Sequence, residues 1–166
     1  MHRGLFLWWY NALDMQETLI HQPGDMLPLA RDILGVLPQA TDHATLLALH
    51  GELGAGKTTF VQALARALGI TEQVVSPTFV VMRQYAIPAH ERFAALIHID
   101  AYRIESLDEL APLRFNELVR DPRNLVCIEW AGKIESALLT DAVHLHFTHA
   151  ADDLRKIVYG FGPETE

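Results

Sequence analysis

The stretch GELGAGKT, residues 51–58, has the residue types and spacing of a phosphate-binding turn, G-x-x-x-x-G-K-[ST]. Its three glycines permit backbone conformations that point successive N–H groups at an anion, and the start of a helix adds a favourable dipole. The ammonium of Lys57 suits the β- and γ-phosphates, and the hydroxyl of Thr58 suits a magnesium ion. A chance glycine-rich turn is the alternative. Because an apolar run precedes the motif and a helical pattern follows it, the sequence predicts a nucleoside triphosphate site.

The base of the nucleotide is encoded less directly, because this turn recognises phosphates. Guanine-specific proteins usually add an Asn-Lys-x-Asp tetrapeptide, and the sequence contains none. This favours ATP. A triphosphate in such a turn is normally bound as its magnesium complex, so Mg²⁺ is expected with it.

Two carboxylates could serve the hydrolysis of such a nucleotide. Asp100 in HIDAYR (residues 98–103) and Glu129 in CIEW (residues 127–130) each end an apolar run. Open α/β sheets place their ligand sites at the carboxyl ends of the strands. Hydrolysis needs one acid to organise the metal and one group to orient or deprotonate water. For either residue alone, an acid that caps the next turn is the alternative, and spacing does not decide which carboxylate has which role.

The elements that must position these residues alternate along the chain. Short apolar or alternating runs predict strands at residues 17–21, 45–50, 80–86, 93–100, 125–129, 142–148 and 155–161. Asp25 can cap a helix that runs to about Leu37, and a second helical pattern runs from residue 58 to Gly69. Ser106 can cap a short helix that Pro112 separates from residues 113–119. This order predicts an α/β fold of the P-loop NTPase class, with a mainly parallel central sheet, helices on both faces and antiparallel C-terminal edge strands.

The length and apolar content fit one domain. Half of the 166 residues are hydrophobic, which is enough for a substantial core, and we assign residues 15–166 to a single domain. Residues 1–14 form an extension that is too short to span a bilayer and lacks a convincing cleavage site, and Met15 is an alternative start. No association with a membrane is expected.

The charge and the cysteine content indicate which binding partners and which cellular compartment to expect. Acidic residues outnumber basic ones by 21 to 13, giving a net charge of -8, and no stretch gathers Lys and Arg into a stripe. Direct binding of nucleic acid is therefore disfavoured. The single cysteine, Cys127, lies in an apolar run and permits no internal disulfide, which suits a reducing cytoplasm.

Four motifs in this order and spacing resemble the TsaE family, formerly called YjeE, of small bacterial P-loop ATPases. They are GELGAGKTTF (51–60), SPTF (76–79), HIDAYR (98–103) and IEW (128–130), within a similarity that covers roughly residues 15 to 160. The resemblance implies a magnesium-dependent ATPase required for N6-threonylcarbamoyladenosine at position 37 of tRNAs that read codons starting with A. It also implies TsaB and TsaD as partner proteins, contact with tRNA only through their complex, and hydrolysis that resets this complex.

The resemblance also divides the roles of the residues. It assigns Asp100, Thr78 and Lys57 to catalysis, with Asp100 acting on water or through a metal-bound water and Thr78 in a switch-like loop. It assigns Thr58 and Glu129 to the metal. Trp130 is expected to pack or to face a partner. The residues that the resemblance assigns to the nucleotide are Asp25, Glu52, Leu53, Gly54, Ala55, Gly56, Lys57, Thr58, Thr59 and Arg155. Relatives often read IEWPER where this chain reads IEWAGK, so it departs from the family pattern after Trp130.

The alternatives are a small P-loop kinase, a nucleotide sensor and a transition-metal site. A small P-loop kinase usually carries an Arg-rich lid, and no compact Arg-rich segment follows the phosphate-binding turn. A nucleotide sensor that does not hydrolyse ATP is distinguished only by the effect of replacing Asp100. His144 and His146 in HLHFTH share one strand face, but with no cysteine nearby we interpret them as solvated residues and not as a transition-metal site. Turnover of the isolated chain is expected to be slow, because no arginine finger is evident.

Overall fold

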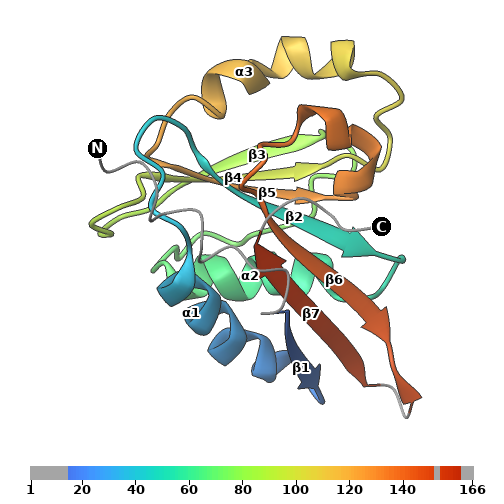
Figure 1. The fold of residues 1–166 in the computed structure, drawn as a ribbon. Helices are drawn as coiled ribbons and strands as arrows, with labels where there is room; N and C mark the ends of the chain where they lie inside the picture. The colour runs from blue at the N-terminus through green and yellow to red at the C-terminus, as the bar shows by residue number, and fades with distance from the viewer. Residues whose placement is uncertain (1–14, 152–153, 162–166) are drawn as a thin grey trace, which may run out of the picture.

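The fold is built around one β-sheet, drawn as arrows in Figure 1. A computed structural model describes residues 15–151 and 154–161, and within these residues the sheet has seven strands in the order β1-β7-β6-β2-β5-β4-β3. The strands are β1 (Gln16–Ile20), β2 (Thr45–Gly51), β3 (Met82–Ala86), β4 (Ala95–Asp100), β5 (Asn124–Glu129), β6 (Val143–His149) and β7 (Arg155–Phe161). The predicted extension over residues 1–14 lies outside the described residues.

Four neighbouring strands make the centre of the sheet parallel. Strands β6, β2, β5 and β4 all run in the same direction, which confirms the predicted parallel centre of an α/β fold. Strand β7 pairs antiparallel with β6, as predicted for the C-terminal strands. The sequence did not place the two outer strands: β1 adds to β7, and β3 adds to β4, both antiparallel. Each edge of the parallel centre is therefore closed by antiparallel pairing.

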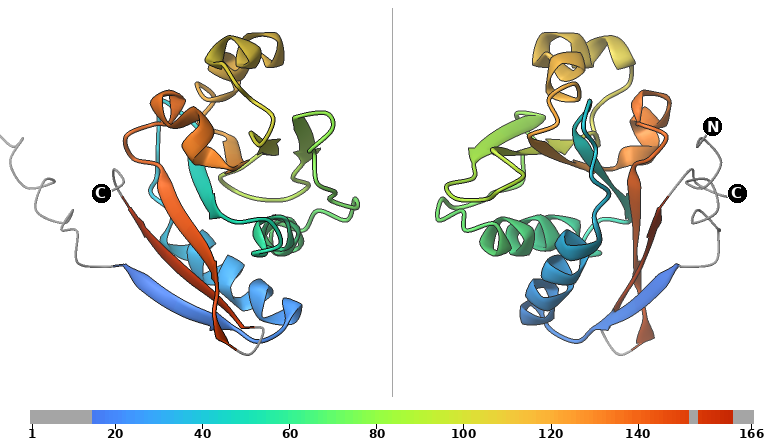
Figure 2. Two further views of the ribbon diagram at one scale, coloured as in Figure 1. Left: turned by 90° about the vertical axis from the view of Figure 1, so that its right-hand side faces the viewer. Right: turned by 60° about the vertical axis from the view of Figure 1, so that its left-hand side comes forward.

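Helices cover both faces of the sheet, as Figures 1 and 2 show. The alternation of side chains along β2 sends Leu47 and Leu49 to one apolar cluster and Leu46 and Ala48 to another. The first cluster includes residues of α1 (Met26–Val36) and α2 (Lys57–Ala67), and the second includes residues of η2 (Leu107–Leu113), α3 (Phe115–Leu118) and η3 (Ala131–Ala137). Among the described residues, no helix is both long and apolar enough to cross a bilayer.

Two predicted details of the helix ends are wrong. Asp25 does not cap α1 through its side chain; its carboxylate accepts the N–H groups of His21 and Gln22 at 2.9 and 3.1 Å and so closes the short turn η1 (Pro23–Asp25). Pro112 lies inside η2, and the break before α3 falls at Arg114, whose φ is +55°. Ser106 does cap η2, because its hydroxyl oxygen accepts the N–H of Asp108 at 3.3 Å.

The histidines of β6 also differ from the expectation. We predicted solvated residues, but only 7% of the surface of His144 is exposed, and its ring stacks on that of His50 in β2. His146 is partly buried and stacks on His50 as well. Strand pairing brings β6 beside β2, a neighbour that the sequence pattern of β6 does not specify.

Candidate functional site

The phosphate-binding turn connects β2 to α2, and its glycines adopt conformations that other residues rarely take. The φ angles of Gly51, Gly54 and Gly56 are +139°, +77° and +107°. A Cβ atom on Gly51 would lie 2.3 Å from the carbonyl oxygen of Phe147, so this position also needs a residue without a side chain. Helix α2 begins directly after Gly56, which leaves the first N–H groups of the helix at the turn, as anion binding requires.

Lys57 is held in the middle of this turn. Only 4% of its surface is exposed, and its ammonium donates to the carbonyl oxygens of Gly51 and Glu52 at 2.6 and 2.9 Å. The same nitrogen lies 4.2 Å from the centre of the Trp130 ring. Burial lowers the pKa of Lys57, an effect that the negative charges of Glu129, Asp100 and Glu52 oppose. An anion in the turn would favour the charged form further.

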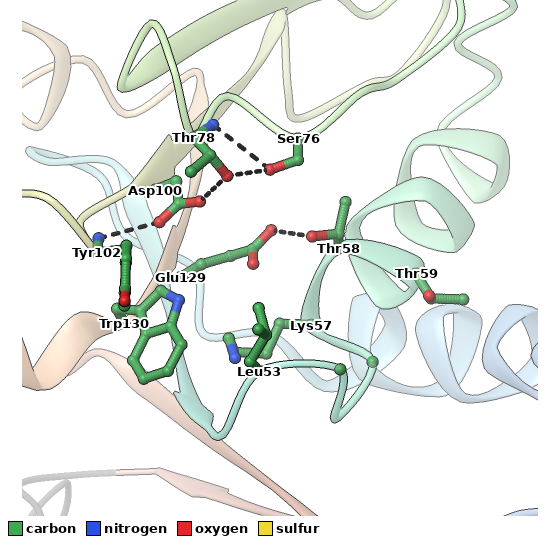
Figure 3. A pocket seen from close by; sticks show the side chains of 12 residues that line it. Leu53, Lys57, Thr58, Thr59, Ser76, Thr78, Asp100, Tyr102, Glu129 and Trp130 are labelled. Atoms are coloured by element: carbon green, nitrogen blue, oxygen red, sulfur yellow. Dashed lines mark hydrogen bonds between the residues drawn. The ribbon is translucent and has the colours of Figure 1, made fainter.

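Thr58 and Glu129 meet across the pocket although 71 residues separate them. The Thr58 hydroxyl donates to Oε1 of Glu129 at 2.8 Å (Figure 3), and only 3% of Glu129 is exposed. Two neighbouring oxygen ligands of an octahedral Mg²⁺ ion lie about 2.9 Å apart, given Mg–O distances of about 2.0–2.1 Å. These two oxygens therefore already have a separation that suits adjacent positions on one magnesium ion, and the pair fits the metal that the sequence predicts.

His98 is a site residue that the sequence analysis missed. It is fully buried in β4, and its Nε2 lies 2.8 Å from the same Oε1 of Glu129. A His98 tautomer with its proton on Nε2 donates this hydrogen bond to the carboxylate oxygen. Its Nδ1 has no hydrogen-bond partner among the described residues. A signal was present: His98 interrupts an apolar strand two positions before Asp100, and residues two apart share one face of a strand.

We expect His98 to orient the Glu129 carboxylate, because hydrogen bonds to a metal-binding group fix its direction. His98→Leu should raise the Mg²⁺ concentration needed for half-maximal nucleotide binding by about 10- to 100-fold. His98→Gln, which can place an N–H donor near Nε2, should recover most of this loss. The measurement is a magnesium titration of nucleotide affinity, with thermal unfolding of each variant to confirm folding.

His149→Leu is the matched control, because His149 is an exposed residue of β6 that makes no contact with Glu129 in the structure. It should leave the titration unchanged. If His98→Leu and His98→Gln weakened magnesium-dependent binding equally, His98 would act through packing and would not orient Glu129.

A second group of polar side chains joins Asp100 to the loop after α2. The Thr78 hydroxyl donates to Oδ2 of Asp100 at 2.6 Å, and the N–H of Tyr102 donates to Oδ1 at 3.0 Å (Figure 3). The hydroxyls of Ser76 and Thr78 are 2.6 Å apart, so Ser76, which the sequence analysis did not select, belongs to the same network. Asp100 is 4% exposed. A movement of the SPTF loop would therefore directly change the hydrogen bonding of the Asp100 carboxylate.

The SPTF loop is fastened to β4 by its backbone. The N–H groups of Val80 and Val81 both donate to the carbonyl oxygen of Pro77, and the carbonyl oxygen of Val81 accepts the N–H of Asp100 at 2.9 Å. Val81 has a φ of +65°, an unfavourable conformation for a β-branched residue. The structure thus holds Thr78 and Asp100 together through both a side-chain and a backbone connection.

The remaining predicted residues surround these groups to different degrees. Thr59 and Arg155 line a second hollow beside the turn together with Met26, whereas Asp25 does not line it. The backbone contacts of Asp25 hold the pKa of its carboxyl below the usual range. Glu52 is exposed at the turn, and Ala55 is buried beneath it. The main pocket of the site is called the hollow below. The predicted residues that line it are Leu53, Gly54, Gly56, Lys57, Thr58, Thr59, Thr78, Asp100 and Glu129.

Comparison with known proteins adds independent information. The family model described as threonylcarbamoyl adenosine biosynthesis protein TsaE matches residues 20–157. The tRNA threonylcarbamoyladenosine biosynthesis protein TsaE of Bacillus subtilis is 38% identical over 114 residues, which are 69% of this chain and 68% of that protein. The protein of the same description from Streptomyces coelicolor is 39% identical over 124 residues, covering 70% of this chain and 80% of that protein.

A solved structure agrees with these sequence matches. The crystal structure of Bacillus subtilis YdiB superposes with a TM-score of 0.65 and 28% sequence identity. The superposition covers 90% of this chain and 86% of that chain. The similarity therefore extends over almost all of the fold and is not confined to the phosphate-binding turn.

Proposed function

Because the chain belongs to the TsaE family of threonylcarbamoyl adenosine biosynthesis proteins, we propose that it is a magnesium-dependent ATPase acting through a TsaB–TsaD complex. Membership gives it a part in tRNA threonylcarbamoyladenosine biosynthesis. The proposal adds the chemical activity, the metal and the partners. The modification served is N6-threonylcarbamoyladenosine at position 37 of tRNAs that read codons starting with A.

The observation that carries the ATPase proposal is the arrangement of four side chains around one hollow. Lys57 lies in the phosphate-binding turn, Thr58 touches Glu129, and Asp100 lies next to Glu129 in the register of β4 and β5. These positions supply a cation for the phosphates, two oxygen ligands for a metal and a second acid for water. Mg²⁺ bound by Thr58 and Glu129 would neutralise charge on the β- and γ-phosphates.

In the proposed reaction, Asp100 orients the attacking water and accepts its proton. Thr78 hydrogen-bonds Asp100 from the SPTF loop, so movement of that loop would change how the carboxylate is held. A partner that orders the loop could therefore control hydrolysis. We accordingly expect slow turnover by the isolated chain.

The surface around the hollow supports a protein partner. The side chains of Leu53 and Phe79 are 85% and 84% exposed, and Tyr102 is 54% exposed. Leu53 and Tyr102 line the hollow, and Phe79 follows Thr78 in the loop. Large apolar side chains gathered beside a site are typical of protein contacts, and the net charge of -8 disfavours a direct tRNA contact.

The test combines partner capture with hydrolysis. Immobilised chain should retain purified TsaB and TsaD in a manner that depends on ATP or ADP, and the complex should raise the rate of hydrolysis. Phe79→Ser should reduce capture at least about tenfold while leaving ATP affinity unchanged. Val36→Ser removes a half-exposed apolar side chain from α1 and should not affect capture.

Rapid hydrolysis by the chain alone, with no effect of TsaB and TsaD, would contradict the partner proposal. Transfer of the γ-phosphate to a small acceptor would replace hydrolysis by a kinase activity. Full tRNA modification by an Asp100 variant that no longer hydrolyses ATP would identify the chain as a sensor.

A further inference from the structure

Three histidines form a cluster on the sheet away from the proposed ATPase residues. His50 directly follows the buried residues of β2, and His144 and His146 lie on β6. Strand β6 lies beside β2 in the sheet (Figure 1). The register pairs His50 with His146 and Ala48 with His144, so the three side chains share one face. Helix η3 covers that face, because Ala48 packs in the same apolar cluster as Ala131 and Ile134.

This cluster is separate from the candidate ATPase site. Glu129 and Cys127 share a face of β5. Cys127 packs in the other apolar cluster, which includes residues of α1 and α2. The histidines therefore lie on the opposite face of the sheet from Glu129. None of the three lines the hollow that contains Lys57 and Asp100.

The three imidazoles are close enough to act together. The ring of His50 lies 5.1 Å from that of His144 and 4.7 Å from that of His146, with interplanar angles of 13° in both cases. Nε2 of His50 and Nδ1 of His144 are 3.0 Å apart. One nitrogen from each residue can be chosen so that all three lie within 4.8 Å of one another.

These distances leave space for a metal ion after a small adjustment. For three atoms no more than 4.8 Å apart, some point lies within about 2.8 Å of each, while a zinc–nitrogen bond is about 2.0–2.1 Å long. Shifts of under about 1 Å per nitrogen would therefore complete the coordination. Side-chain rotation can supply such shifts, since His50 and His146 are only partly buried.

We propose that His50, His144 and His146 form a binding site for a transition-metal ion of the Zn²⁺ class, distinct from the magnesium site. Three imidazoles suit zinc, cobalt, nickel or copper, whereas Mg²⁺ prefers oxygen ligands. Water can fill a fourth position, and Glu135 of η3 is a carboxylate whose charge acts on His50. Such an ion would tie β2 to β6 immediately before the phosphate-binding turn, which begins at Gly51.

The environment of the cluster agrees with this geometry. Burial, together with the charges of His146 and His144, lowers the pKa of His50 to about 4, and Glu135 has the opposite effect. At neutral pH the His50 ring is thus uncharged, the form in which imidazole binds metals. This agrees with the proposal, which stands on the positions of the three rings.

The test measures Zn²⁺ binding to tag-free protein by calorimetry, with millimolar Mg²⁺ present to occupy oxygen sites. We expect one equivalent of Zn²⁺ to bind, and His50→Ala and His146→Ala each to weaken binding at least about tenfold. Both are partly buried residues, so these substitutions disturb the core less than a change at His144 would. His149→Ala is the matched control, because this exposed histidine of β6 lies outside the cluster, and it should leave the affinity within about twofold.

Cobalt gives a second, spectroscopic measurement. Co²⁺ should give visible absorption bands of a four- or five-coordinate ion that disappear in His50→Ala and His146→Ala. No sulfur-to-metal band is expected, because the single cysteine, Cys127, is fully buried and outside the cluster. Zinc binding and cobalt bands that persist unchanged in both alanine variants, or no binding by the unchanged protein, would overturn the proposal. This result does not depend on ATP hydrolysis.

Discussion

Asp100→Asn is expected to slow ATP hydrolysis by about 10²- to 10⁴-fold while leaving ATP affinity within about twofold. Asparagine keeps one acceptor oxygen for the Tyr102 N–H, and its NH2 group can donate to the Thr78 hydroxyl in place of the bond that Thr78 donates to Oδ2, but it cannot accept a proton from water. Single-turnover hydrolysis with TsaB and TsaD present measures the first quantity, and a fluorescent ATP analogue measures the second.

Asp108→Asn is the matched control, because it removes the same charge from an exposed position at the start of η2. Hydrolysis by this variant should be unchanged. A rate for Asp100→Asn within tenfold of normal would mean that Asp100 holds the SPTF loop and does not act on water. Thr78→Val would then show the same modest loss, since it removes the hydroxyl that contacts Asp100.

Glu129→Gln is expected to weaken the magnesium-dependent binding of ATP by about 100-fold, or about 2.7 kcal/mol. The substitution keeps the size of a side chain that is 3% exposed and an oxygen that can accept from Thr58 and His98. It removes the negative charge that attracts Mg²⁺, because a neutral amide is a weaker magnesium ligand than a carboxylate. ATP affinity measured with excess Mg²⁺ should fall to the value measured with a chelator.

Glu135→Gln provides the control for this change, because Glu135 is exposed in η3 and lies outside the hollow. Its magnesium dependence should match that of the unchanged protein. An unchanged magnesium dependence in Glu129→Gln, together with a loss in Asp100→Asn, would exchange the two proposed roles. The two substitutions thus decide which carboxylate binds the metal and which acts on water, a question that spacing alone leaves open.

Several features could be predicted from the sequence because they depend on residues that are near one another in the chain. The phosphate-binding turn consists of eight consecutive residues, and its glycine conformations and helix start are local properties. The apolar runs that end at Asp100 and Glu129 predicted strands, and the structure confirms strands that end at these residues. The mainly parallel centre followed from the alternation of strand and helix patterns, because parallel strands need crossover connections.

The tertiary structure decided how these parts meet. Pairing of β4 with β5 puts Asp100 beside Glu129 and gives His98 a partner 31 residues away, and the packing of α2 gives Glu129 its contact with Thr58. A strand pattern shows which residues share a face, but it does not show which strand will lie alongside. For the same reason, the sequence pattern of β6 predicts that His144 and His146 are solvated. In the structure, the pairing of β6 with β2 places them against His50, which is 94 residues from His144.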